Sequence, residues 1–237
     1  FQILSHSFEG ESQFIRIKYK TFIKNINLNL IGKIQLKNML MAIIAAINSN
    51  VNLNQILNAL PKIKSIEGRL EKIGKIKNDS KVILDYAHTP QALKICLLNL
   101  RDQFPDKKIV LLFGCGGNRD IDKRYKMGKV ASDYADLIYL TDDNPRFESP
   151  VKIRQKIKKG IKIKKKVIEI SNRAIAISKA IKNLNTGEIL LVAGKGHEKT
   201  QDIGKRKIYF SDKNFILSAI RVKNKNLSNN LKLNIIK

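Results

Sequence analysis

The chain has 237 residues, with 46 Lys or Arg against 20 Asp or Glu, and a formal net charge of +26. Its two cysteines fit neither a zinc pattern nor a secreted disulfide framework. The longest strongly apolar stretch, residues 39–47, is far shorter than the ~20 residues of a membrane span. We therefore expect a cytoplasmic protein with one core, or one and a partial second one.

The positive charge is spread along the chain, because Lys, Ile and Asn are abundant throughout. No base-reading motif or interleaved aromatic pattern accompanies it. We expect weak, salt-sensitive attraction to polyanions and no specific nucleic-acid partner. Residues 152–166 hold nine Lys or Arg and no acid. At helical spacing they predict a solvated face, with a membrane surface or nucleic acid as the lesser alternative.

The first part of the chain predicts a small mixed unit. Residues 14–31 alternate roughly and predict strands at a sheet edge. Residues 35–48 predict a helix whose apolar face holds Leu36, Leu40, Ile43, Ile44 and Ile47. Residues 53–60 predict a second short helix, which Pro61 ends. Residues 62–80 are charged and carry turn signals, so we place the domain boundary there and expect domains 1–66 and 67–237.

The second part predicts an α/β domain. Strand-like apolar runs, each closed by a polar loop, occur at residues 81–84, 108–113, 136–140 and 188–193. Helical patterns occur at residues 91–103, 125–134, 151–160, 173–183 and 212–223. Ser171 and Ser211 are the expected N-caps of the last two helices, and the final dozen residues are expected to fray. This order predicts a Rossmann-like, mostly parallel sheet.

The loop after residue 140 carries the strongest functional signal. It reads Thr-Asp-Asp-Asn-Pro-Arg, from Thr141 to Arg146. Pro145 fixes its own φ and keeps Asn144 out of the helical region, so the loop is stiff. Ligands of open α/β sheets bind at the carboxyl ends of strands. The loop suits a ligand that carries both a carboxylate and an ammonium group.

Other strand ends carry further motifs, each with an ordinary structural explanation. The glycines of residues 114–117 allow close approach of a ligand, and equally make a tight turn. Asn-Pro is a common turn former. His88 and His197 alone are more often structural than catalytic. The lysine of Gly-Lys-Gly at residues 194–196 lacks the complete phosphate-loop pattern. Only the combination, in this order and at these spacings, is specific.

This combination resembles the Mur ligases of peptidoglycan synthesis, and among them the diaminopimelate-adding type. The matching elements are EGRLE at 67–71, DYAHTP at 85–90, FGCGGNRD at 113–120, TDDNPR at 141–146 and VAGKGHE at 192–198. Family members have three domains. The resemblance implies the tail of the central ATP-binding domain at 1–66 and the C-terminal, amino-acid-binding domain at 67–237. A start at Phe1 agrees with a piece of a longer chain.

The resemblance implies an ATP-driven amide synthesis. ATP phosphorylates the D-glutamate γ-carboxylate of UDP-N-acetylmuramoyl-L-alanyl-D-glutamate, and an amine of meso-diaminopimelate attacks the acyl phosphate. The family's phosphate loop, and the carbamylated lysine that holds magnesium, find no match here. The Mg²⁺ ligands are therefore expected mostly outside this chain, the fragment alone is expected to be inactive, and the enzyme is expected to be a monomer.

Several residues match the family's binding positions. The diaminopimelate positions correspond to Arg119, Asn144, Arg146, Gly194 (through its backbone) and Glu198. Arginine binds a carboxylate in a fork, and Glu198 would take the ammonium. L-Lysine lacks the distal carboxylate and would leave Arg146 unpaired, so the site would reject it.

The ATP positions correspond to Arg69 for phosphates, Asp85 for the ribose diol and Asn38 near the adenine. Gln35 stands where the family has a second asparagine, and no firm role follows for His88, Lys195 or His197. No catalytic residue is assigned. The alternatives are the lysine-adding sister ligase, a related folylpolyglutamate synthase, and a non-catalytic diaminopimelate-binding module. The Asn-Pro-Arg sequence argues against the first two.

Overall fold

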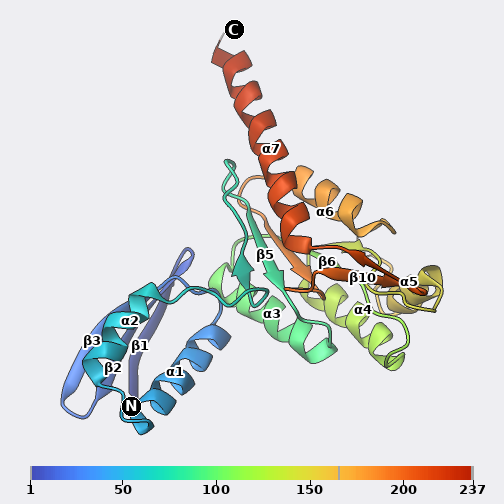
Figure 1. Cartoon of the computed structure of the whole chain (residues 1–237). Coiled ribbons are helices and arrows are strands. Elements are labelled where there is room, and N and C mark those ends of the chain that lie inside the picture. Colours follow the sequence, from blue (N-terminus) through green and yellow to red (C-terminus); the bar gives the residue numbers. More distant parts are fainter. Residues whose placement is uncertain (1, 165, 236–237) are drawn as a thin grey trace. The chain divides into compact units, whose positions relative to one another are not determined.

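The structure is a computed structural model that describes residues 2–164 and 166–235, with side chains described as far as residue 228 (Figure 1). By its internal contacts the chain divides into two compact units. The first comprises Phe1–Ile66 and Asn99–Pro105, and the second comprises Glu67–Leu98 and Asp106–Lys237. Each unit is described by itself.

The first unit is an antiparallel three-stranded sheet with two helices. Strands β1 (Gln2–Glu9), β2 (Ser12–Tyr19) and β3 (Phe22–Leu28) pair in the order β1-β2-β3. They are followed by α1 (Lys33–Asn48), α2 (Leu53–Ala59) and a 3₁₀ turn at Leu60–Lys62. Alternate residues of β2 and β3 pack against one face of α1 and α2, in a core of Ile15, Ile17, Ile26, Leu28, Leu36, Met39, Ile43, Ile56 and Leu57. The alternation thus predicts β2 and β3, whereas the mostly exposed β1 lacks that signal.

The second unit is built on a six-stranded sheet of order β4-β5-β9-β6-β7-β8. Its strands are β4 (Glu71–Lys72), β5 (Lys81–Asp85), β6 (Ile109–Phe113), β7 (Leu137–Leu140), β8 (Val167–Glu169) and β9 (Ile189–Ala193). Every neighbouring pair is parallel except the edge pair of β4 and β5. All residues of β6 and β9 are buried, as continuous apolar strands covered on both faces should be. The α/β fold with a mostly parallel sheet is confirmed.

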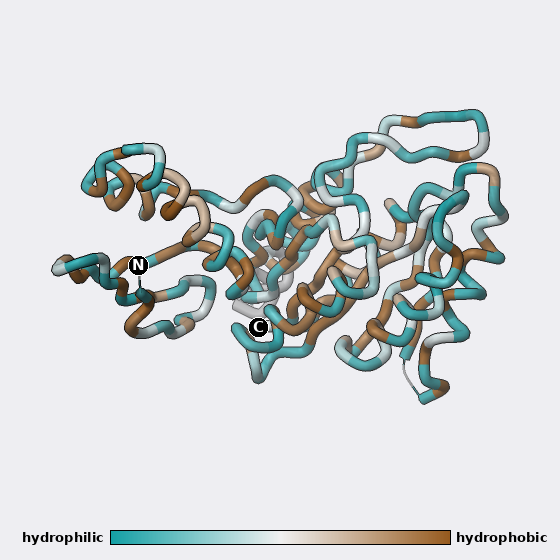
Figure 2. The backbone as a smooth tube through the Cα atoms, turned by 90° about the horizontal axis from the view of Figure 1, so that it is seen from below, coloured by the Kyte–Doolittle hydropathy of each residue, from teal (hydrophilic) through white to brown (hydrophobic). Residues whose placement is uncertain are grey.

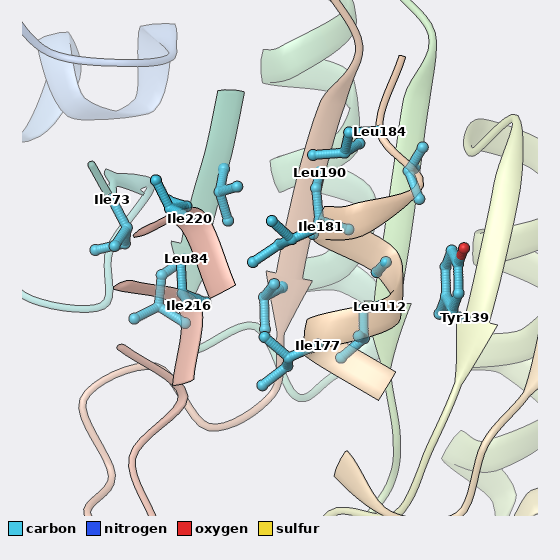
Figure 3. Packing of buried hydrophobic residues seen from close by; sticks show 14 of the residues in the cluster. Ile73, Leu84, Leu112, Tyr139, Ile177, Ile181, Leu184, Leu190, Ile216 and Ile220 are labelled. Atoms are coloured by element: carbon cyan, nitrogen blue, oxygen red, sulfur yellow. The ribbon is translucent and has the colours of Figure 1, made fainter. Parts of the chain in front are cut away.

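Helices cover both faces of this sheet. They are α3 (Pro90–Gln103, whose residues from Asn99 group with the first unit), α4 (Asp122–Tyr134), α5 (Pro150–Lys158), α6 (Arg173–Lys182) and α7 (Asp212–Ile235). Helices α6 and α7 lie on one face of the sheet and α4 on the other (Figure 1). Leu84, Leu112 and Leu190 of the strands pack against Ile177, Ile181, Ile216 and Ile220 of α6 and α7 (Figure 3). In Figure 2, hydrophobic stretches run through the middle of this unit, among more hydrophilic segments.

Two expectations about helix ends are wrong. Asn172, and not Ser171, caps α6: its Oδ1 accepts a hydrogen bond from Ile175 N at 3.0 Å. The last helix does not end near Lys223 but continues to Ile235. The expected cap of that helix is present, because Ser211 Oγ accepts a hydrogen bond from Asn214 N at 3.4 Å.

The basic stretch at residues 152–166 is only partly helical. Helix α5 ends at Lys158 and strand β8 begins at Val167. Most of the described lysines in residues 152–166 are exposed, as expected. Arg154, however, is buried and forms ion pairs with Asp142 and Glu169. In the part of the chain that the structure describes, no helix is long and apolar enough to cross a membrane.

Sequence reasoning also missed a β-hairpin. Strands β10 (Thr200–Ile203) and β11 (Arg206–Tyr209) pair antiparallel. All four residues of β11 are exposed, so the hairpin lacks the apolar alternation that would predict it.

Candidate functional site

A pocket of about 410 Å³ opens at the carboxyl ends of the parallel strands. The loops after β5, β6, β7 and β9 supply its walls, as expected for an open α/β sheet. Its lining includes three basic and three acidic side chains, namely Arg119, Lys123, Arg146, Asp120, Asp143 and Glu198. All five residues expected at the amino-acid site line it: Arg119, Asn144, Arg146, Gly194 and Glu198. The pocket thus presents both signs of charge, which suits a zwitterionic ligand.

The glycine loop after β6 packs backbone-to-backbone against the Asn-Pro-Arg loop after β7. A Cβ on Gly117 would overlap the carbonyl oxygen of Pro145, and one on Gly114 would overlap that of Thr141. Gly117 N donates a hydrogen bond to Asn144 O at 2.8 Å. The glycines are therefore needed where the two loops meet.

Arg146 is held in an unusual conformation by the β10–β11 hairpin. Its φ is +51°, in a backbone region that residues other than glycine rarely adopt. Its N–H donates to Asp202 O at 3.0 Å, and its carbonyl accepts from Gly204 N at 2.7 Å. In the side chain, Nη1 donates to Gly117 O at 2.7 Å, and Nε lies 3.9 Å from Asp202 Oδ2. The missed hairpin thus fixes the position of this arginine.

A partly buried ion pair connects the two loops to α4. The Arg124 side chain is fully buried, and its Nη1 and Nη2 each lie 2.8 Å from an oxygen of Glu148. Nη2 also donates to Gly116 O at 3.2 Å. These hydrogen bonds from Arg124, together with one from the backbone N–H of Asn118, lower the pKa of Glu148 to about 2. The pair ties α4 to the glycine loop and to the loop before α5.

Asn144, Lys195 and Glu198 form a closed polar cluster on one wall. Lys195 Nζ lies 2.9 Å from Asn144 Oδ1 and 2.8 Å from Glu198 Oε2. Asn144 Nδ2 donates to the same oxygen of Glu198 at 3.1 Å. Sequence reasoning placed Asn144 and Glu198 at the site but gave Lys195 no role.

Gly194 has limited room to contact a ligand. Its φ is +114°, and a Cβ there would lie 2.8 Å from Asp143 Oδ2. Its N–H already donates to Asp85 O at 3.1 Å. Among the described residues the Gly194 carbonyl oxygen has no hydrogen-bond partner, so it is the backbone group left to bind a ligand.

The Asp85 carboxylate already accepts hydrogen bonds from the nearby backbone. Its Oδ2 accepts from Leu70 N and its Oδ1 from Ala87 N, both at 2.7 Å, and the residue is buried. It thereby joins the Glu-Gly-Arg-Leu segment to the end of β5. A ribose diol would have to use the lone pairs that these two bonds leave, so this contact stays a prediction.

The other two expected nucleotide residues lie in different units. The Arg69 guanidinium stacks over the Tyr86 ring, 4.9 Å from its centroid, in the second unit. The Tyr86 ring also contacts the rings of His88 and His197. Asn38 is exposed on α1 of the first unit, where it and the buried Gln35 line a second pocket of about 430 Å³. The nucleotide contacts of all these residues stay predictions.

Other pocket residues were not foreseen, among them Cys115, Lys123 and Asp143. Burial and the nearby Asp143 carboxylate raise the pKa of the Cys115 thiol to about 12. The thiol therefore stays protonated near neutral pH and is a poor nucleophile. Among the described residues, no cluster of three or more His, Cys, Asp or Glu could hold a metal ion.

Residues 68–196 match the family model described as Mur ligase, glutamate ligase domain. The chain belongs to the Mur ligase family. The match covers more than half of the chain and includes the pocket loops after β5, β6 and β7 and the start of the loop after β9, but it ends before Glu198.

Similar proteins support this Mur ligase assignment. A UDP-N-acetylmuramoyl-L-alanyl-D-glutamate–2,6-diaminopimelate ligase of Rickettsia conorii is 39% identical over 220 residues, which are 92% of this chain and 44% of that protein. The ligase of the same name from Buchnera aphidicola is 42% identical over 199 residues, 84% of this chain and 39% of that protein. A solved structure of a ligase of this name aligns with a TM-score of 0.72 and 31% identity, covering 93% of this chain and 45% of that one. The chain thus spans less than half the length of these relatives.

Proposed function

We propose that this chain belongs to an ATP-dependent ligase that adds meso-diaminopimelate to UDP-N-acetylmuramoyl-L-alanyl-D-glutamate. The observation that carries the proposal is the convergence of Arg119, Asn144, Arg146, Gly194 and Glu198 on one pocket. These residues come from three loops up to 79 positions apart in the sequence. The names of the similar proteins support this substrate.

The chemistry of the pocket fits the distal end of meso-diaminopimelate. That end carries a carboxylate and an ammonium group. Arg146 and Arg119 would bind the carboxylate, because a guanidinium offers paired donors in the plane of a carboxylate. Glu198 and the adjacent Asp143 would attract the ammonium. Asn144 would contribute the N–H that its bond to Glu198 leaves over.

Binding there would place the other amine for reaction. The ligase must hold that amine beside the acyl phosphate and exclude water, because orientation supplies much of the rate of such a bimolecular step. In this proposal the second unit supplies the amino-acid pocket, with Arg69 and Asp85 contacting ATP. Residues 1–66 form the tail of the central ATP-binding domain, with Asn38 near the adenine. ATP and Mg²⁺ would be held mostly by parts of the ligase that this chain lacks, and the ligase would act in the cytoplasm as a monomer.

A chimaera tests the proposal. These 237 residues would replace the matching part of the Rickettsia conorii ligase, and amide formation would be measured with meso-diaminopimelate and with L-lysine. The expected result is ATP-dependent product with meso-diaminopimelate and at least ~100-fold lower kcat/KM with L-lysine. The chain alone should not hydrolyse ATP.

The other outcomes separate the alternatives. Equal use of both amino acids, or a preference for lysine, would favour the lysine-adding sister enzyme. An inactive chimaera, together with a free chain that binds meso-diaminopimelate, would favour a non-catalytic binding module. The unmodified Rickettsia ligase, assayed in parallel, is the positive control.

A further inference from the structure

Lys195 is a fully buried lysine directly behind the pocket wall. It is absent from the pocket lining, whereas both of its hydrogen-bond partners, Asn144 and Glu198, belong to it. A buried ammonium group is costly unless it is paired and hydrogen-bonded. Its two contacts of 2.9 and 2.8 Å therefore commit its charge to these wall residues rather than to a ligand.

The bonds from Lys195 fix the orientation of the Asn144 amide. An ammonium group can only donate, so the atom facing it must be the carbonyl oxygen Oδ1. Asp202 N donates to the same oxygen at 3.1 Å. The amide nitrogen is thereby turned toward Glu198, and only one of its two N–H bonds is used there.

The same bonds divide the two oxygens of Glu198. Lys195 and Asn144 both donate to Oε2. In the part of the chain that the structure describes, Oε1 accepts no hydrogen bond from the protein, and the Glu198 side chain is 31% exposed. One oxygen of this carboxylate is thus anchored while the other is free to accept from a ligand.

The nearby Arg173 does not share this task. Its guanidinium is fully buried and pairs with Asp212 at 2.7 Å, and it also donates to Ala193 O at 2.9 Å. It holds the end of β9 to the start of α7. Among the residues that the structure describes, Lys195 is therefore the cation that hydrogen-bonds both ligand-facing groups of this wall.

We propose that Lys195 is the positioning residue of the amino-acid pocket. It anchors Oε2 of Glu198 and Oδ1 of Asn144, so that Oε1 and one amide N–H remain aimed at the ligand's distal ammonium and carboxylate. This inference rests on the proposed function, because it assigns a diamino acid as the ligand.

Binding of meso-diaminopimelate to the chain by calorimetry, with Lys195→Met, Glu198→Gln and the double variant, tests the proposal. Each single change should weaken binding about 10- to 100-fold, since each breaks one charged pair. The double variant should bind about as weakly as the weaker single variant, because both changes disrupt one unit. Lys199→Met, at an exposed lysine of the same loop, should change affinity less than about twofold.

Losses that simply multiply in the double variant would overturn the proposal, as would unchanged affinity in a folded Lys195→Met chain. If Lys195→Met does not fold, Lys195→Gln, which keeps one N–H donor, replaces it under the same criteria. If the parent chain binds no meso-diaminopimelate, the proposed function is refuted instead. In that case a crystal structure of the ligand-free Lys195→Met chain decides the positioning role of Lys195. Displaced Asn144 and Glu198 side chains support that role, and unmoved ones refute it.

Discussion

At the scale of single residues, the pocket depends on positions where only a hydrogen atom fits. Gly117 illustrates this, because its Cα faces the carbonyl of Pro145 and its own carbonyl accepts from Arg146. A tight turn was expected from the sequence of this loop. The partner that makes the glycine necessary lies 28 positions away in the chain, and local pattern carries no signal for such a contact.

We predict that Gly117→Ala destabilises the chain by about 2–4 kcal/mol and weakens meso-diaminopimelate binding, since relieving the overlap must move the Asn-Pro-Arg loop. Thermal unfolding and calorimetry would measure the two effects. The matched control is Gly10→Ala, in the turn between β1 and β2. Its Cβ would meet nothing within 4 Å, so only the positive φ of +55° opposes it, at about 1 kcal/mol. Equal losses in the two variants would contradict this explanation.

The site residues themselves were largely predictable, because the resemblance carried them over one by one. Their protein partners were not. Asn144 and Glu198 were expected to bind ligand atoms directly, yet each already bonds to Lys195. Likewise, both carboxylate oxygens of Asp85 already accept hydrogen bonds from backbone N–H groups. Such pairings depend on side-chain geometry across loops, which periodicity and turn signals do not specify.

At the scale of elements, the Arg124–Glu148 pair connects α4 to the two ligand loops. The pKa of Glu148 lies near 2, below its ordinary value of 4.5. A carboxyl group whose pKa is lowered by folding contributes stability above its unfolded pKa and loses it as the pH falls through the folded pKa. The contribution of this pair should therefore be complete above about pH 5 and vanish toward pH 2.

The variant Glu148→Gln tests this directly. At pH 7 it should be less stable than the parent by about 2–4 kcal/mol, because Arg124 stays buried without its counter-charge. The difference in unfolding free energy between parent and variant should shrink as the pH is lowered from 5 to 2. Chemical denaturation at several pH values measures it. A difference that stays constant over this range would show that the charge of Glu148 is not the cause.

The helices and strands that could be predicted from the sequence are those with strong apolar runs or periodicity. Buried strands β5, β6, β7 and β9 were found within one residue of their ends. The β10–β11 hairpin was missed because its residues are mostly polar or exposed. The hairpin hydrogen-bonds both the N–H and the carbonyl of Arg146, and such contacts leave no periodic apolar pattern in the sequence.

At the scale of the whole molecule, the net charge of +26 says little about function. The pocket itself is balanced, with three basic and three acidic side chains. The parallel sheet brings these groups together, since it gathers loops from distant parts of the chain at one edge. The chain also spans less than half the length of the similar proteins. The assignment of meso-diaminopimelate as the ligand of the pocket is therefore best tested by binding rather than by turnover.

The most direct measurement compares the affinities of the parent, Arg146→Ala and Arg146→Lys for meso-diaminopimelate and for L-lysine. Arg146→Ala should weaken meso-diaminopimelate binding about 30- to 1000-fold, as expected when one partner of a desolvated charge pair is lost. Arg146→Lys should recover only part of this loss, because an ammonium group cannot fork a carboxylate. L-Lysine, which lacks the distal carboxylate, should bind the parent weakly and lose far less. If both ligands lost affinity by the same factor in a variant that unfolds like the parent, Arg146 would be structural, and meso-diaminopimelate would lose its main support as the ligand of this pocket.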